Sequence, residues 1–161
     1  MNQVEAYAGD KLEDFPLGAY AVLVLAFVGG FGSMLVQASR NGKLPRRIGA
    51  RDIALLGVAT HRLTRLFTRE RVTAIVRFPF TRLEGTAGAG EVSEHARGHG
   101  LQRAVGSLMT CQFCAAPWTA AGLTAGLLKR PRETRVIASV LAMIAISDFL
   151  HQAYAKARAA S

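Results

Sequence analysis

The segment Leu17–Val36 reads LGAYAVLVLAFVGGFGSMLV and carries no charged side chain. The uncharged region around it extends from Asp14 to Arg40, and an α-helix needs about 20 apolar residues to cross the hydrocarbon core of a bilayer. A secretory signal would have a basic start and a shorter apolar core, whereas the residues before Leu17 are mainly acidic. We therefore expect a membrane helix that is retained in the mature protein.

Composition and charge agree with a membrane environment. The chain has 161 residues, of which 50% are apolar and 19% charged, and its mean hydropathy is +0.21. These values suit one domain and exclude a disordered chain. The net charge of +9 would suit nucleic acid, but the sequence shows no recognition element or stacking aromatics. Anionic lipid headgroups explain the same charge, so we expect a lipid bilayer as partner and no nucleic acid.

Two further apolar segments lie in the C-terminal half. No charged residue interrupts the chain between Arg103 and Lys129, and Val136–Ala155 is interrupted only by Asp148 and a histidine. Pro131 must break a helix between them, because proline lacks the amide donor and restricts the residue before it. The two segments predict an antiparallel helical hairpin. The fold class expected is an all-α integral membrane bundle with three or four membrane helices.

The uncertain helix is Asp52–Arg69, DIALLGVATHRLTRLFTR. At 100° per residue its apolar side chains fall on one side and its arginines on the other, which is typical of an amphipathic helix. Such a helix lies in the membrane surface with its arginines on lipid phosphates. The alternative is a short, tilted fourth span whose arginines reach the interface.

The remaining sequence divides around these helices. An acidic tail and the first helix make up residues 1–40, a membrane domain follows over 41–155, and 156–161 form a basic tail. Within the membrane domain, Val72–Leu83 loses its period around a proline and predicts an interfacial elbow. The glycine-rich stretch 84–100 predicts a solvent loop.

Orientation follows from the basic residues, which gather on the cytoplasmic side of short loops. The loop after the first helix holds five of them, which predicts an N-terminus outside the cell. The link Lys129–Arg135 is also basic. If Asp52–Arg69 spans the membrane, the loop after the first helix and the link Lys129–Arg135 both lie in the cytoplasm. If it is interfacial, the link lies on the opposite side. The charge distribution thus favours a span while the amphipathic pattern favours the interface, and the sequence leaves both possibilities open.

Cys111-Gln-Phe-Cys114 is the first feature that could carry chemistry. A CxxC pair can cycle between dithiol and disulfide or supply half of a zinc site. His95 and His99 could complete the zinc site, although the pair would then lie too deep along a helix to meet loop histidines. A membrane thiol oxidase would need a second cysteine pair, and this chain has only two cysteines. The plainest interpretation is two small residues that pack between helices.

Asp148 and His151 form the second feature, because their spacing puts them on one helix face. Ionisable groups within membrane helices are costly and usually face a partner in the bundle. We expect Arg62 or Arg65 to be the counter-charge of Asp148, which would join the amphipathic helix to the last span. Proton transfer through these groups and His61 is the functional alternative to a plain interhelical contact.

Small residues one helical turn apart predict where helices approach closely. Gly122 with Gly126 forms one such pair, and Gly29 with Ser33 forms another. Both faces suit packing within the bundle, a homo-oligomer or contact with another membrane protein. Nucleotide-binding loops, nucleophile elbows and HExxH helices are absent from the sequence, so no hydrolase or ATPase is indicated.

Several segments together resemble a bacterial family of small membrane proteins of unassigned function, domain of unknown function 1360, which includes a sporulation-associated protein. The resemblance covers about residues 51–155 and is most specific at RLTRL, RFPFTRLEG, TCQFC and the Asp148-Phe149 pair. It implies membrane residence and no established catalytic activity. The matching positions, none with an assigned role, are Arg62, Arg65, Cys111, Cys114 and Asp148. His61, His95 and His99 lie outside the pattern.

The sequence thus predicts a multi-pass protein of the bacterial cytoplasmic membrane that acts as a non-enzymatic structural or interaction component. We assign it no cofactor and no metal. The alternatives are a membrane thiol redox protein and a metal-binding membrane protein, both using Cys111 and Cys114.

Overall fold

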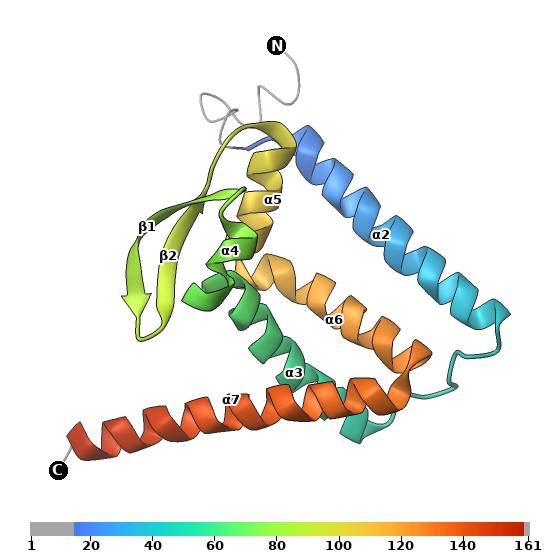
Figure 1. Ribbon diagram of the computed structural model, residues 1–161. Coiled ribbons are helices and arrows are strands. Elements are labelled where there is room, and N and C mark those ends of the chain that lie inside the picture. Colours follow the sequence, from blue (N-terminus) through green and yellow to red (C-terminus); the bar gives the residue numbers. More distant parts are fainter. Residues whose placement is uncertain (1–14, 160–161) are drawn as a thin grey trace. The chain divides into compact units, whose positions relative to one another are not determined.

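The computed structural model describes residues 15–159, so the predicted acidic tail lies outside the described residues. The described part is mostly helical and divides into two compact units. Unit 1 holds the chain up to Ser33 together with Leu66–Ala115, and unit 2 holds Met34–Arg65 together with the chain from Ala116 onward. The elements, seen in Figure 1, are α2 (Leu17–Arg40), α3 (Ala50–Arg69), η2 (Arg71–Thr73), α4 (Ala74–Arg77), β1 (Thr81–Gly88), β2 (Glu91–Ala96), α5 (Gly100–Thr110), α6 (Gln112–Lys129) and α7 (Pro131–Ala159).

Two of the described helices, α2 and α7, are long and apolar enough to cross a membrane by length and composition. Three or four such helices were expected, and the described residues support two of them. The helix α3 does not qualify, because its arginines lower its hydropathy. The uncharged run before Lys129 does not qualify either, and it forms two helices, α5 with 11 residues and α6 with 18.

The chain breaks that run at Cys111, whose backbone is extended at φ −104° and ψ 109°. The helix α5 therefore ends at Thr110, and α6 starts at Gln112. The Thr110 hydroxyl donates to the carbonyl oxygens of Gly106 at 3.0 Å and Ser107 at 3.3 Å. Carbonyls at a helix end lack partners within the helix, and this hydroxyl supplies one. The segment between Arg103 and Lys129, which was predicted to be one helix of the hairpin, is thus two helices.

Residues 84–100 are not a solvent loop, because most of them belong to an antiparallel hairpin of β1 and β2. The register runs from Thr81 opposite Ala96 to Gly88 opposite Glu91, with two irregularities. Gly90 turns the chain at φ +79°, a conformation that glycine adopts without steric cost. The sequence prediction was wrong because the glycines were interpreted as a loop signal. The strands also bury a single apolar side chain, Val92, so they lack the alternation of apolar and polar residues that indicates a strand.

Unit 1 is held together where this hairpin packs on α5 (Figure 1). The backbone of Gly106 in α5 approaches β2 so closely that a Cβ there would meet Ala96 at 3.0 Å and collide with the carbonyl oxygen of Phe80. Gly106 is accordingly buried. The segment Val72–Leu83, which was predicted to be an interfacial elbow, contains most of the η2–α4 turn and the start of β1.

Unit 2 has its core where α3, α6 and α7 meet. Ala59 and Ala138 are completely buried, and they pack with Leu123 and Leu141. Alanine at these positions lets helix backbones approach closely. As the proline predicts, α6 ends at Lys129 and α7 begins at Pro131, because proline is suited to the first turn of a helix.

Candidate functional site

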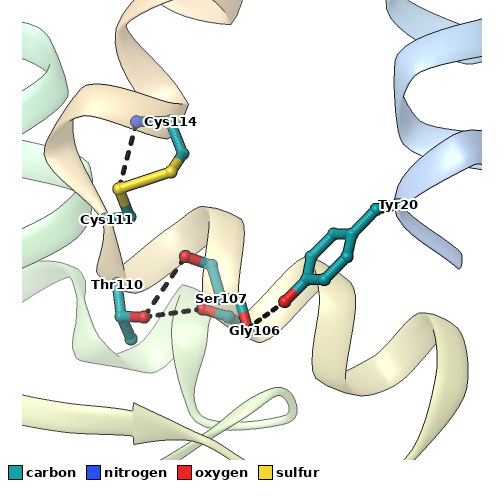
Figure 2. The surroundings of a disulfide bond; sticks show 6 residues. All are labelled: Tyr20, Gly106, Ser107, Thr110, Cys111 and Cys114. Carbon is teal, nitrogen blue, oxygen red and sulfur yellow. Dashed lines mark hydrogen bonds between the residues drawn. A yellow bond between two sulfur atoms is a disulfide. The ribbon is translucent and has the colours of Figure 1, made fainter. Parts of the chain in front are cut away.

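The cysteine pair lies in unit 1 at the junction of α5 and α6. Cys111 and Cys114 form a disulfide, with their Cα atoms 5.2 Å apart. Cys111 precedes the first residue of α6, and its carbonyl oxygen accepts the helical hydrogen bond from Ala115 at 3.0 Å. Its Sγ accepts a hydrogen bond from the backbone N–H of Cys114 at 3.2 Å (Figure 2). Cys111 therefore caps the N-terminus of α6 with its sulfur.

The two cysteine residues differ in their exposure. Cys111 is half-buried and Cys114 is exposed. Phe113, between them, is 89% exposed. Below the pair, the Tyr20 hydroxyl of α2 donates to Ser107 of α5 at 3.2 Å (Figure 2). The disulfide thus lies beside an uncovered aromatic side chain, on a helix junction that side-chain hydroxyls hold in place.

The histidines proposed as further zinc ligands do not join this pair. Among residues 15–159, no group of three or more His, Cys, Asp or Glu side chains is arranged to hold a metal ion. His95 lies on β2, with its Nδ1 3.0 Å from a carboxylate oxygen of Glu84. His99 precedes α5.

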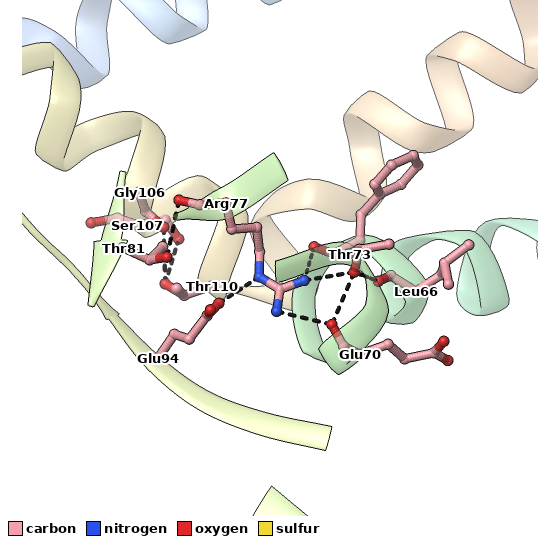
Figure 3. A network of polar contacts seen from close by, with 10 residues as sticks. Leu66, Glu70, Thr73, Arg77, Thr81, Glu94, Gly106, Ser107 and Thr110 are labelled. Carbon is pink, nitrogen blue, oxygen red and sulfur yellow. Dashed lines mark hydrogen bonds and ion pairs between the residues drawn. The ribbon is translucent and has the colours of Figure 1, made fainter. Parts of the chain in front are cut away.

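A buried arginine, Arg77, donates four side-chain hydrogen bonds in unit 1. The Arg77 side chain is 1% exposed, and its Nε donates to the Glu94 carboxylate at 2.5 Å. The other guanidinium nitrogens donate to the carbonyl oxygens of Phe67 at 2.9 Å and Glu70 at 3.0 Å, and to the Thr73 hydroxyl at 2.7 Å (Figure 3). This one side chain connects the end of α3, the η2 turn and β2. Its planar fork of donors suits several acceptors at once.

This network was not predicted from the sequence. A usable signal was the arginine in the apolar VRFPF elbow, since a buried charge needs a partner. Nothing in one sequence says that Glu94 is that partner, because the pair spans 17 residues and depends on the hairpin register.

In unit 2, the structure brings together two residues that the sequence singled out. Arg62 Nε lies 3.4 Å from Asp148 Oδ2, and the two side chains are 13% and 33% exposed. The neighbouring rings of His61 and Phe149 stack with their centroids 6.2 Å apart. His151 is exposed.

The small residues that were predicted to lie at helix contacts differ in how closely other atoms approach them. Gly126 approaches α7, where an added Cβ would lie 2.8 Å from the Thr134 hydroxyl oxygen. Gly122 and Gly29 have nothing within 4 Å of such a Cβ. The Ser33 hydroxyl bonds back to the Gly30 carbonyl oxygen at 2.9 Å, within its own helix.

A second ion pair joins α3 to α7 at the basic end of unit 2. Arg135 donates through Nε and one terminal nitrogen to the two carboxylate oxygens of Asp52, each at 2.8 Å. These hydrogen bonds hold the pKa of Asp52 below its usual value, aided by the positive charge of Arg135 and opposed by partial desolvation. The sequence did not indicate this pair, whose members lie 83 residues apart.

The pair borders a cavity of about 440 Å³. Lys43 and Arg47 line it from the segment after α2, and Lys129 lines it from the end of α6. The basic loop after α2 and the basic link between α6 and α7 therefore line the same cavity. These are the two segments that the sequence could not place on one side of the membrane with an interfacial α3. Among the described residues that line the cavity, Asp52 alone carries a carboxylate, and this group is paired with Arg135.

Comparison with known proteins gives one match. A family model described as a protein of unknown function, DUF1360, matches residues 55–154. Neither a search of curated proteins nor a search of solved structures finds a match. The matched segment covers more than half of the chain and includes Arg62, Asp148 and both cysteines, so the chain belongs to the DUF1360 family of proteins of unknown function.

Proposed function

We propose that this protein is an integral membrane component that acts through structure and interaction, with α2 and α7 crossing the bilayer. The observation that carries the proposal is the uncovered apolar surface of these helices. None of the most apolar window of α2 is buried, and only 17% of that of α7. Burying apolar surface is worth about 25 cal/mol per Å², and lipid tails supply that burial.

The apolar side chains on these helices are large. In α2, Val24, Leu25 and Val28 are 60–70% exposed. In α7, Met143 and Leu150 are 60% and 65% exposed. Exposed apolar surface on this scale is typical of a contact with a membrane or with another protein. A second copy or another membrane protein would pack against the same faces within the bilayer.

The Arg62–Asp148 contact supports the packing of α3 against the apolar stretch of α7. Ionisable groups near the membrane usually pair with one another, and this pair joins the amphipathic helix to α7. The helix α3 is then held by a neighbouring helix and does not need a span of its own. Its role in the proposal is structural.

The cations around the 440 Å³ cavity support contact with anionic headgroups on one side of the membrane. Each basic residue near an anionic surface contributes about 1 kcal/mol of attraction. We expect the purified protein to be more thermally stable in vesicles that contain phosphatidylglycerol than in phosphatidylcholine alone. The double variant Lys43→Gln, Lys129→Gln should lose most of that difference in thermal stability. An equal difference in the variant would contradict the proposal that the cavity contacts anionic headgroups.

Membrane fractionation tests the main proposal. The expected result is that the full chain stays with membranes through alkaline carbonate washing and is released only by detergent. Arginine at the centre of a span costs about 2.5–3.5 kcal/mol, so Leu25→Arg combined with Val28→Arg should shift protein out of the membrane fraction. The matched control, Leu44→Arg, changes an apolar residue in the segment after α2 and should not. A monodisperse wild-type monomer in the detergent-free soluble fraction would overturn the proposal.

The structural role of Arg62 is tested by charge reversal. Arg62→Asp and Asp148→Arg should each lower thermal stability in detergent, and the double reversal should recover it, since polar contacts between membrane helices contribute about 1 kcal/mol. Additive losses in the double variant would contradict a direct contact.

A further inference from the structure

We propose that Cys111 and Cys114 form a thiol–disulfide exchange site that accepts two electrons from the dithiol of a second protein. This inference goes beyond the proposed membrane role and does not depend on it. It rests on three features of unit 1: what the disulfide joins, where its sulfurs lie on α6, and what is exposed beside them.

The disulfide does little for the stability of the fold. It joins Cys111, the residue before α6, to Cys114 in the first turn of that helix. The stabilisation that a crosslink supplies through chain entropy grows with the length of the loop it closes, and this loop is close to the shortest that a disulfide can close. No second element is joined by the bond. A purely structural purpose therefore explains it poorly.

The position of Cys111 favours a reactive pair. A helix N-terminus carries partial positive charge from its unpaired N–H groups, and Cys111 precedes the first residue of the 18-residue helix α6. Its Sγ already accepts the N–H of Cys114 at 3.2 Å. When the disulfide opens, the same N–H stabilises a thiolate on Cys111. Cysteines at helix N-termini are more acidic than free cysteine for this reason.

Exposure decides which sulfur is attacked. As a whole residue, Cys114 is exposed while Cys111 is half-buried, so we expect an incoming thiolate to attack Sγ of Cys114. Phe113, 89% exposed in the same turn, offers apolar contact to the protein that brings the thiolate. Because the better-stabilised thiolate leaves faster, Cys111 is the matching leaving group.

The exchange then balances in two steps. A partner thiolate attacks Cys114 Sγ, a mixed disulfide forms, and the Cys111–Cys114 bond breaks to release the Cys111 thiolate. The partner's second thiolate attacks the partner sulfur of the mixed disulfide and releases the Cys114 thiolate. The partner gains a disulfide, two electrons pass to the cysteine pair, and two protons restore both thiols.

The first experiment maps the attacked sulfur, with reduced glutathione as the probe. Detergent-solubilised oxidised full chain is exposed briefly to glutathione, quenched with N-ethylmaleimide and mapped by peptide mass spectrometry. The expected species carries glutathione on Cys114 and maleimide on Cys111, in at least tenfold excess over the reverse species. Phe113→Ser should leave this small-molecule reaction unchanged. A disulfide that stays fully oxidised, as structural disulfides do against glutathione, would overturn the proposal.

A second experiment separates a reactive pair from a merely exposed one. Alkylation rates are measured against pH for Cys114→Ser, which leaves Cys111, and for Cys111→Ser, which leaves Cys114. The midpoint for Cys111 should lie about one pH unit below that for Cys114, because only the former sulfur caps the helix. Coincident midpoints would refute the role of the helix terminus. Should either variant fail to fold by circular dichroism, the wild-type mapping still decides the proposal.

Discussion

Replacing Arg77 with methionine should open the hairpin of unit 1. The guanidinium is 1% exposed and the Glu94 side chain 6%, so the substitution leaves a buried carboxylate without its cation. It also removes donors from two backbone carbonyls and one hydroxyl. Breaking a buried pair by removing one partner costs about 3–5 kcal/mol. Since 1.4 kcal/mol is a factor of ten, a middle value of about 4 kcal/mol corresponds to a change of roughly 10³-fold in the opening equilibrium.

Hydrogen–deuterium exchange of the detergent-solubilised full chain measures this opening directly, because local opening is read at the amides it exposes. The β1 and β2 amides of Arg77→Met should lose about 10³-fold in protection, while those of α7 change little. Arg82→Met is the matched control, since Arg82 is an exposed arginine on β1. Replacing both partners, Arg77→Met with Glu94→Leu, should recover much of the loss. Hairpin protection in Arg77→Met equal to that in Arg82→Met would refute the reasoning.

Two other changes test the packing and the charges. Gly106→Ala should lower the melting temperature of unit 1, because the new methyl group meets the Phe80 carbonyl and overpacking costs about 1–3 kcal/mol. Gly122→Ala is the control and should not lower it, because the space beside Gly122 is open. Equal losses in the two variants would contradict the close approach of α5 to the hairpin. The pKa of Asp52 is lowered in the folded state, so its pairing with Arg135 stabilises the fold at neutral pH and the stabilisation disappears as pH falls through that lowered pKa. The stability difference between wild type and Asp52→Asn in low salt should therefore vanish in acid, and a difference that is independent of pH would exclude this role.

Local pattern was enough for several elements. The uncharged run from residue 15 to 39 predicted α2, because helix length and apolar composition are properties of one continuous segment. The amphipathic period predicted a helix at Asp52–Arg69, close to the observed Ala50–Arg69. Pro131 predicted the break between α6 and α7. Each of these signals acts over a few helical turns.

The prediction of Arg62 or Arg65 as counter-charge for Asp148 had a different basis. It followed from the cost of an unpaired charge on an apolar helix, which limits the possible partners without locating them. The structure has Arg62 at 3.4 Å from Asp148. The roles of these residues in a membrane stay predictions.

The sequence by itself indicated apolar segments of membrane-spanning length, where proline stops a helix, and which charges need partners. Tertiary structure alone decided that the glycine-rich stretch pairs as a hairpin, that the chain extends at Cys111, and that Arg77 meets Glu94 and Arg135 meets Asp52. The physical reason is range. Helix length and periodicity are summed over neighbours along the chain, whereas strand register and ion pairing depend on which distant backbone lies alongside once the apolar surfaces have been packed.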